Sequence, residues 1–216
     1  MKPINIIFLG KPGSGKGTQA EILKEKFSLH LIDTGEILRR LIKEGGPLAD
    51  NILKTIKQGG LVPIWLVVFC WLKELINIPP EKGVVFEGSP RQLEEAKILK
   101  EALCWLKRKK IKVIYLNISD EEIIKRLSTR RMCPNCLREY SLELNSELKK
   151  TKKCPVCHLP LKRRPDDNPR TIKNRLVSFK KDVYPVIRFF KKEGLLIEIN
   201  AEGPVEEITQ KILESL

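Results

Sequence analysis

The sequence has no hydrophobic run long enough to cross a membrane. Its most apolar segment, Leu61 to Leu72, is far shorter than the roughly 20 residues that a membrane-spanning helix needs, and Pro63 interrupts it. The apolar stretch after Lys2 is too brief for a signal peptide and fits a strand instead. Internal repeats and low-complexity linkers are also absent. These absences exclude the membrane and repeat classes, and we expect a soluble cytoplasmic protein.

Acidic residues are few relative to basic ones. The chain has 41 Lys and Arg residues against 27 Asp and Glu residues, which gives a formal net charge of +14 at pH 7. This balance favours anionic partners. Two basic clusters, 107–112 and 149–153, supply much of it, either as solvated faces or as surfaces that contact RNA. No aromatic residue is interleaved with either cluster, which weakens the RNA interpretation because bases stack on aromatic side chains.

Length and composition predict one folded domain with insertions, since 42% of the 216 residues are hydrophobic and 31% are charged. The predicted strands are 4–9, 29–32, 83–87, 111–116 and 195–199, and the predicted helices are 14–27, 64–77, 92–106, 119–130, 171–192 and 204–215. This alternation predicts an α/β fold, in which right-handed crossovers build a parallel sheet covered on both faces. Ligands of such sheets bind at the carboxyl ends of the strands, here at Gly10, 33–35 and 87–91. Residues 132–165 break the pattern and are predicted to form an inserted small subdomain.

A glycine-rich turn follows the first predicted strand and opens a helix. It reads Gly10-Lys11-Pro12-Gly13-Ser14-Gly15-Lys16-Gly17-Thr18. Its four glycines let the backbone adopt conformations closed to other residues and direct successive N–H groups to one point. The helix adds its positive dipole end, Lys16 adds a charge for the β- and γ-phosphates, and Thr18 offers a hydroxyl toward a phosphate or metal. Gly17 intervenes where the strict pattern has Ser or Thr, so the turn predicts a variant of the phosphate-binding loop.

Four of the six cysteines form two C-x₂-C pairs that are separated by 17 residues. The pairs are Cys133 with Cys136 and Cys154 with Cys157. Four thiolates complete a tetrahedral Zn²⁺ site with no open position, so we expect a structural metal that stabilises a segment too small for its own core. Disulfides are an alternative that reducing cytosol disfavours, and an Fe–S cluster is another. We interpret His158, beside the fourth cysteine, as a bystander.

The other cysteines and the tryptophans lie on apolar helical patterns. They are Cys70, Cys104, Trp65, Trp71 and Trp105. Since residues on such patterns most often pack in the core, we interpret all five as core residues and not as ligands or base-stacking platforms.

Six motifs occur in one order along the chain. They are 10–20 with the glycine-rich turn, Asp33-Thr34-Gly35-x-x-Leu38-Arg39, Glu87-Gly88-x-Pro90-Arg91, Arg126-x-x-x-Arg130-Arg131, the four-cysteine insert, and Arg163-Arg164-x-Asp166-Asp167-Asn168 with Asn174-Arg175-Leu176. With these motifs, essentially the whole chain resembles the adenylate kinases of the zinc-lidded bacterial kind. The resemblance implies a P-loop kinase fold whose five-stranded parallel core comprises 1–126 and 166–216. It also implies a nucleoside-monophosphate-binding segment at 33–63, a lid at 127–165 with structural Zn²⁺, and a monomer.

The activity that the resemblance implies is the reversible reaction ATP + AMP = 2 ADP, with Mg²⁺ bound to ATP. Such a reaction gathers negative charge around the group in flight, and arginines clamp phosphate oxygens with planar forks. The implied catalytic residues are Lys16, Arg91, Arg130, Arg164 and Arg175. The implied ATP-binding residues are Gly13, Ser14, Gly15, Lys16, Gly17, Thr18 and Arg126, and the AMP-binding ones are Thr34, Arg39, Leu61, Val62, Gly88, Arg91 and Glu95. Glu87 would orient waters on magnesium, and Asp166 and Asp167 would pair with lid arginines.

Four positions depart from the family pattern. Glu87 stands in place of Asp, Ser89 in place of an aromatic residue, and Pro165 stiffens the exit of the lid. Glu95 stands where the family carries a glutamine that reads adenine, and an ionised carboxylate cannot donate to a ring nitrogen. Two alternatives to AMP phosphorylation therefore stay open: a kinase for another monophosphate such as UMP or CMP, and an inactive relative that binds nucleic acid through its basic surface.

Overall fold

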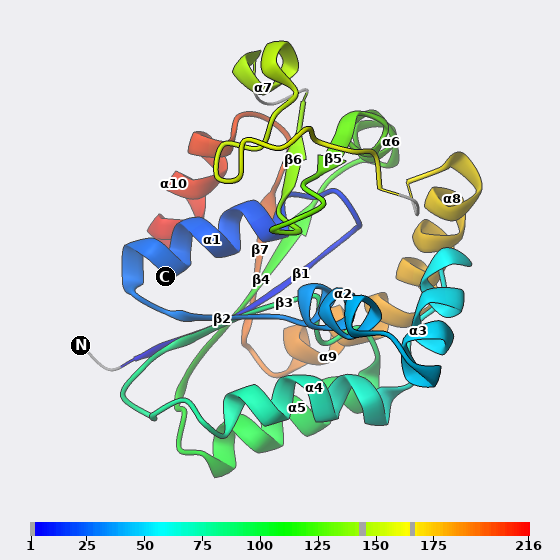
Figure 1. Cartoon of the computed structure of the whole chain (residues 1–216). Coiled ribbons are helices and arrows are strands. Elements are labelled where there is room, and N and C mark those ends of the chain that lie inside the picture. The colour runs from blue at the N-terminus through cyan, green and yellow to red at the C-terminus, as the bar shows by residue number, and fades with distance from the viewer. Residues whose placement is uncertain (1–2, 143–145, 165–166) are drawn as a thin grey trace.

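Five parallel strands form the central sheet of the computed structural model, which describes residues 3–142, 146–164 and 167–216. The strand order is β2-β3-β1-β4-β7 (Figure 1). The strands are β1 (Ile4–Gly10), β2 (His30–Asp33), β3 (Val84–Glu87), β4 (Lys110–Asn117) and β7 (Leu196–Asn200). The predicted α/β fold with a parallel sheet is confirmed, and each predicted strand end lies within one residue of the observed one.

Helices cover both faces of the sheet. One face carries α1 (Lys16–Phe27) and α10 (Val205–Ser215), and the other carries α4 (Ile64–Leu75), α5 (Leu93–Trp105) and α9 (Tyr184–Lys192). Successive side chains of β1 point to opposite faces of the sheet. Ile6 and Phe8 therefore pack on the side of α1 and α10, whereas Ile7 and Leu9 pack on the side of α4, α5 and α9. All four are buried, as expected for a parallel strand between two helical layers.

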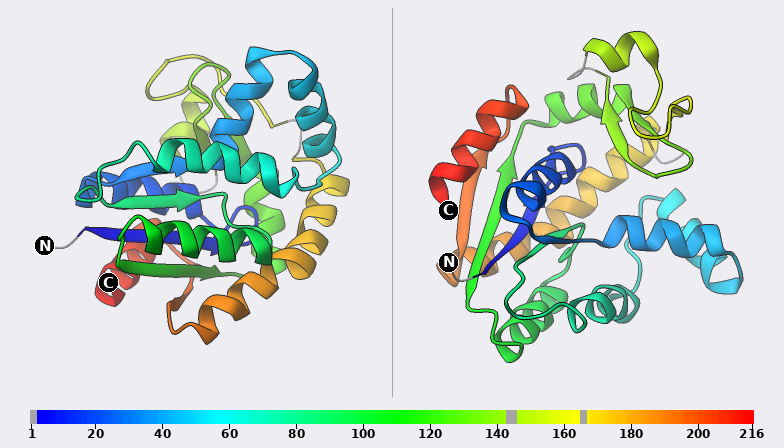
Figure 2. Two further views of the ribbon diagram at one scale, coloured as in Figure 1. Left: turned by 90° about the horizontal axis from the view of Figure 1, so that it is seen from below. Right: turned by 60° about the vertical axis from the view of Figure 1, so that its left-hand side comes forward.

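The predicted helix 171–192 is one rod with an altered turn in its middle. It consists of α8 (Pro169–Ser178), the π-helical turn η1 (Phe179–Val183) and α9 (Figure 2). Asn168 caps α8 by accepting the backbone N–H of Thr171 at 2.9 Å. Ile172 packs in the cluster of α1 and α10, whereas Phe190 packs in the cluster of α4 and α5. The rod therefore passes from one layer of the molecule to the other.

Further elements extend from the core around the carboxyl ends of the strands. The helices α2 (Thr34–Glu44) and α3 (Pro47–Lys57) follow β2, and α6 (Asp120–Thr129) follows β4. A two-stranded antiparallel sheet joins β5 (Arg130–Met132) to β6 (Glu139–Ser141), and α7 (Ser146–Thr151) comes next (Figure 1). The sequence predicts α6, as helix 119–130, but it does not predict α2, α3, α7, β5 or β6. Whether 33–63 and 127–165 move as separate units stays a prediction.

Arg108 is buried, although its sequence neighbourhood predicts a solvated basic face. Only 1% of the residue is exposed. Its guanidinium donates to the backbone carbonyls of Ile78 at 2.6 Å, Lys82 at 2.7 Å and Pro79 at 3.2 Å. These carbonyls belong to the loop before β3, which Arg108 thereby fixes in place. The basic cluster 107–112 is not a uniform surface, and this weakens its interpretation as an RNA contact.

The prediction that all tryptophans are core residues is wrong for two of them. Trp71 and Cys70 on α4 are buried as predicted. Trp65 and Trp105 are 66% and 85% exposed, and Cys104 is exposed beside Trp105. Helical periodicity identifies an apolar face, but it does not show whether another element covers that face. None of the described helices is long and apolar enough to span a membrane.

Candidate active site

The loop after β1 requires glycine for its conformation and for space. The residues at positive φ are Gly10, Gly13 and Gly15. A Cβ on Gly10 would lie 2.6 Å from Ser14 Oγ and 2.9 Å from the Leu116 carbonyl oxygen, so a larger residue does not fit. Gly17 lies in the first turn of α1 without a positive φ, which corrects the prediction that its backbone needs glycine. Nothing lies within 4 Å of a Cβ built there, so the space beside Gly17 is open to a ligand.

Lys16 folds back over this loop. Its ammonium donates to the carbonyl oxygens of Gly10 at 2.9 Å and Lys11 at 2.8 Å. Burial lowers the pKa of Lys16 to about 8, against the opposing effect of Glu87. The charges that lower it further are those of Arg91, Arg175 and Arg130. Lys16 thus lies in the field of three predicted phosphate-binding arginines, where a bound anion would restore its full charge.

Asp167 anchors two of these arginines from a fully buried position. Its two carboxylate oxygens accept Nε of Arg130 at 2.7 Å and Nη2 at 2.5 Å, and Nη1 of Arg175 lies 3.4 Å from Oδ1. Its backbone carbonyl accepts Arg163 Nη2 at 2.8 Å. Because the Asp167 side chain has no exposed surface, these guanidinium groups are held firmly in place. The predicted partner carboxylate Asp166 lies outside the described residues, as does Pro165.

A second carboxylate, Glu139 on β6, contacts three arginines. Arg130 Nη1 lies 2.9 Å from Oε2, Arg39 Nη1 lies 3.4 Å from Oε1, and Arg164 Nη1 makes a close contact with Oε1. Burial by itself raises the pKa of Glu139, but Arg130, Arg164, Arg39 and Arg175 outweigh it and lower the value to about 2. Sequence reasoning missed Glu139, whose only signal is an acidic residue inside a basic insertion.

Asp33 lies at the carboxyl end of β2, next to the end of β3. It caps α2 by accepting the N–H of Glu36 at 2.9 Å, and it lies opposite Glu87 in the pairing of β2 with β3. Burial and Glu87 raise the pKa of Asp33 to about 7, while Arg39, whose Nη2 lies 3.6 Å away, acts in the opposite direction. The Nε of Arg39 is buried and has no hydrogen-bond partner among the described residues. A donor of Arg39 is therefore left for a ligand oxygen.

The predicted acceptor residues around β3 form one small polar cluster. Thr34 Oγ1 donates to Ser89 Oγ at 2.9 Å, and both residues are buried. Glu95 accepts the backbone N–H of Arg91 at 2.7 Å, while Arg91 Nε donates to the Gly88 carbonyl at 2.8 Å. Burial raises the pKa of Glu95, which is 2% exposed, against the effect of the Arg91 N–H. The Oε1 of Glu95 is buried and makes no hydrogen bond in the described parts of the chain.

Arg126, predicted to contact the donor base, already makes hydrogen bonds within the protein. Its Nε donates to Glu122 Oε1 at 2.8 Å and its Nη2 to the Ala201 carbonyl at 3.1 Å, and only 4% of the residue is exposed. The first bond lies within α6, and the second joins α6 to the loop after β7. Contact with a donor base stays a prediction that requires Arg126 to become more accessible.

The four predicted metal ligands come together. All the Sγ atoms of Cys133, Cys136, Cys154 and Cys157 lie within 4.8 Å of one another, and Cys136 and Cys154 are 3.7 Å apart. A tetrahedron with Zn–S bonds of about 2.3 Å separates its sulfurs by about 3.8 Å. Burial by itself raises the pKa of Cys154, but hydrogen bonds from the Tyr140 hydroxyl and from backbone N–H groups lower it to about 6. The set therefore fits a tetrathiolate zinc site, and His158 is not part of it.

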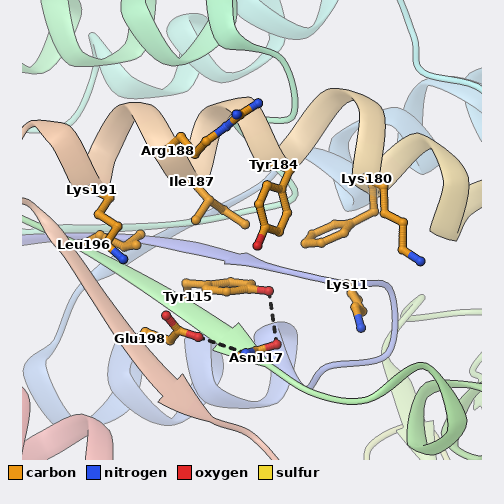
Figure 3. A pocket seen from close by; sticks show the side chains of 11 residues that line it. Lys11, Tyr115, Asn117, Lys180, Tyr184, Ile187, Arg188, Lys191, Leu196 and Glu198 are labelled. Atoms are coloured by element: carbon orange, nitrogen blue, oxygen red, sulfur yellow. Dashed lines mark hydrogen bonds between the residues drawn. The ribbon is translucent and has the colours of Figure 1, made fainter.

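A hollow of about 330 Å³ lies on the sheet face that α9 covers. Figure 3 shows Tyr115 donating to Asn117 Oδ1 at 3.2 Å, and Asn117 donating to Glu198 Oε1 at 2.8 Å. Lys11, Lys180 and other cationic side chains surround it. Its lining includes Lys11 of the glycine-rich turn but none of the arginines that contact Glu139 or Asp167, so it is separate from the arginine cluster.

The structure brings together predicted residues that lie far apart in the sequence. Glu139 joins Arg39, Arg130 and Arg164, and Asp167 joins Arg130 to Arg175. Ser14 is buried in the loop, Thr18 is exposed on α1, Leu61 is partly buried and Val62 is buried. Arg91 is exposed at the edge of the acceptor cluster. The arrangement offers a lysine and several guanidinium groups to one polyanion.

Comparison with known proteins agrees with this chemistry. The adenylate kinase family matches residues 8–195 of the chain. An adenylate kinase of Dehalococcoides mccartyi is 35% identical over 98% of this chain and 97% of its own length. Those of Hydrogenobaculum sp. and Methanothrix thermoacetophila are 36% and 37% identical, and each comparison covers at least 98% of both chains. The chain therefore belongs to the adenylate kinase family.

Proposed function

We propose that the chain catalyses the reversible transfer of the γ-phosphoryl group of ATP to AMP, which yields two molecules of ADP. The observation that carries this proposal is the convergence of Arg39, Arg130 and Arg164 on the carboxylate of Glu139. Arg175 also acts on Glu139, and Arg130 and Arg175 both act on the ammonium of Lys16. Phosphoryl transfer is catalysed chiefly by positioning and by charge stabilisation, and this cluster supplies both.

The loop residues 13–18 would bind the donor phosphates through backbone N–H groups. Lys16 would neutralise the β- and γ-oxygens, and the Thr18 hydroxyl would reach a phosphate or the metal. Mg²⁺, when bound with ATP, supplies further charge neutralisation. Glu87 at the end of β3 would orient the waters of that ion. Arg126 would lie near the base of the donor.

The acceptor would bind between β3 and α2. Arg39 and Arg91 would clamp its phosphate, and the buried and unpartnered Nε of Arg39 supports this role. The residues assigned to its nucleoside are Thr34, Leu61, Val62, Gly88 and Glu95. Glu95 would read adenine as a neutral carboxyl group, which accepts through one oxygen and donates through the other. Its burial supports that protonation state.

Segment 127–165 would act as the lid over a core of 1–126 and 166–216, with 33–63 as the monophosphate-binding segment. The four cysteines would hold a structural Zn²⁺ that keeps the lid rigid. Asp167 would hold Arg130 and Arg175 while the lid closes. Closure would exclude water, which otherwise accepts the phosphoryl group. We expect a cytoplasmic monomer.

Turnover with ATP and a panel of monophosphates tests this proposal. We expect AMP to be preferred, and Arg130→Ala to lower kcat by about 10²- to 10³-fold through lost charge stabilisation. Lys191→Ala, at the separate hollow, is the control that should retain activity. Preference for UMP or CMP would contradict the acceptor assignment. Salt-dependent RNA binding without ADP formation would contradict catalysis altogether.

A further inference from the structure

The proposed roles of the arginines leave Glu139 unexplained. This carboxylate contacts Arg39 on α2, Arg130 on β5 and Arg164, near the end of the insertion 132–165. A guanidinium binds carboxylate and phosphate oxygens through the same planar donors. Glu139 therefore places an anion at the point where the arginines would receive the phosphates of a nucleotide.

Asp167 and Glu139 bind Arg130 in different ways. Asp167 takes the Nε and Nη2 donors of Arg130, and its side chain is fully buried. Glu139 takes Nη1, and 28% of its side chain is exposed. Asp167 can thus stay in place when a ligand arrives, whereas Glu139 lies where solvent and solutes reach it. The first carboxylate is an anchor, and the second one is open to exchange.

Glu139 also links two segments across the site. Its neighbour on β6, Tyr140, contacts Cys154 Sγ through its hydroxyl at 3.4 Å. Alternate residues of a strand point to opposite faces, so β6 directs Tyr140 to the cysteines and Glu139 to the arginines. Because Arg39 belongs to α2, the contact of Glu139 with Arg39 ties the cysteine-bearing segment to α2. A phosphate that binds the same arginines would link the cysteine-bearing segment to α2 in the same way.

We propose that Glu139 is an internal substitute for substrate phosphate, which holds Arg39, Arg130 and Arg164 together until the phosphates of a nucleotide displace it. The proposal rests on the assignment of these arginines to phosphates. A nucleotide brings several negative charges where Glu139 brings one, so the nucleotide wins the exchange. The affinity of the protein for the nucleotide is nevertheless lower than the arginines alone would provide, because the contacts of Glu139 with the arginines must first be broken.

Glu139→Gln tests the exchange, since it removes the charge and keeps the shape. With inorganic pyrophosphate as the probe, we expect the Kd to fall about tenfold, as for the loss of one competing charged hydrogen bond. The KM values for ATP and AMP should fall as well, while kcat does not rise. If Glu139 only held the arginines in position, its loss would have the opposite effect. The arginines would then move apart, bind phosphate more weakly and raise the KM values. Glu36→Gln makes the same charge change at a partly exposed residue of α2 and should leave the Kd unchanged.

Two further variants complete the test. Glu139→Asp keeps the charge but has a shorter reach, so it should bind pyrophosphate more tightly than the wild type, even if the glutamine variant does not fold. Binding that is unchanged or weaker in the folded Glu139 variants overturns the proposal. Arg130→Ala separates this outcome from a failure of the proposed function. If Arg130→Ala leaves pyrophosphate binding and turnover intact, the assignment of the arginines to phosphate is wrong as well.

Discussion

The carboxyl group of Glu95 should make the use of AMP depend on pH. Only its neutral form can donate to a ring nitrogen of adenine, and burial raises its pKa. Above that pKa the neutral fraction falls tenfold with each pH unit, so KM for AMP should rise by up to tenfold per unit, or about 1.4 kcal/mol of binding free energy. Below it, the KM should be flat. The nearby groups that act on Glu95 are Arg91, Ser89 and the N–H of Gln92.

Glu95→Gln isolates this effect, because the amide donates and accepts at every pH. We expect the ratio of the KM for AMP in the wild type to that in the variant to increase as the pH rises above the pKa of Glu95. Taking a ratio removes titrations that both enzymes share, such as that of Lys16 with its pKa of about 8. Glu94→Gln, at an exposed residue of the same helix, is the matched control and should keep the wild-type slope. A ratio that stays constant up to the highest pH at which the enzyme is folded would refute the reasoning.

Three other perturbations have defined outcomes. Arg108→Met leaves buried backbone carbonyls without a hydrogen-bond donor and should lower the free energy of unfolding, measured in urea, by about 2–4 kcal/mol. Lys109→Met changes an exposed residue and should alter that free energy little. Equal effects of the two substitutions would contradict a stabilising role of the buried Arg108 hydrogen bonds. Asp33 has a folded pKa of about 7, above its ordinary value of 3.8, so the native state binds the extra proton and the stability that Asp33 contributes is lost as pH rises from about 4 to about 7. Asp33→Asn keeps the cap, and its Tm relative to wild type should therefore increase over this range; a constant difference speaks against the shift. Removal of zinc by a chelator, or Cys154→Ser, should lower the Tm without removing a catalytic group, and an unchanged Tm after verified metal loss would disprove a structural site.

Local patterns in the sequence predict the features that depend on neighbouring residues. The strand periodicity, the glycine turn and the C-x₂-C pairs are such features, because each one is a property of a few consecutive residues. The roles of Arg108 and Glu139 depend instead on segments that meet only after folding. Arg108 reads as one more cation in a basic run, yet a distant loop supplies its carbonyl partners. No spacing rule links Glu139 to Arg39, since the two lie on separate insertions.

Exposure is the other property that the sequence leaves open. Trp65 and Trp105 belong to apolar helical faces just as Trp71 does, but only Trp71 meets a neighbouring layer. The same limit applies to Arg126, whose motif predicts a ligand contact and whose folded surroundings bury it against Glu122 and Ala201. Motifs identify the chemistry of a side chain, whereas packing decides its accessibility.

The π-helical turn at 179–183 sets the angular register of the rod that contains Arg175. An ordinary α-helix advances about 100° per residue, so deleting one residue from this turn would rotate α8 about its axis by that angle relative to α9. Phe190 and its neighbours on α9 could keep their places in the core, while Arg175 would point away from Asp167. A stable and correctly folded protein would in this way lose the contact of Arg175 with Asp167 through a change in length alone. The extra residue of η1 thus sets the rotation of α8 relative to α9, so that α9 packs in the hydrophobic core while Arg175 on α8 faces Asp167.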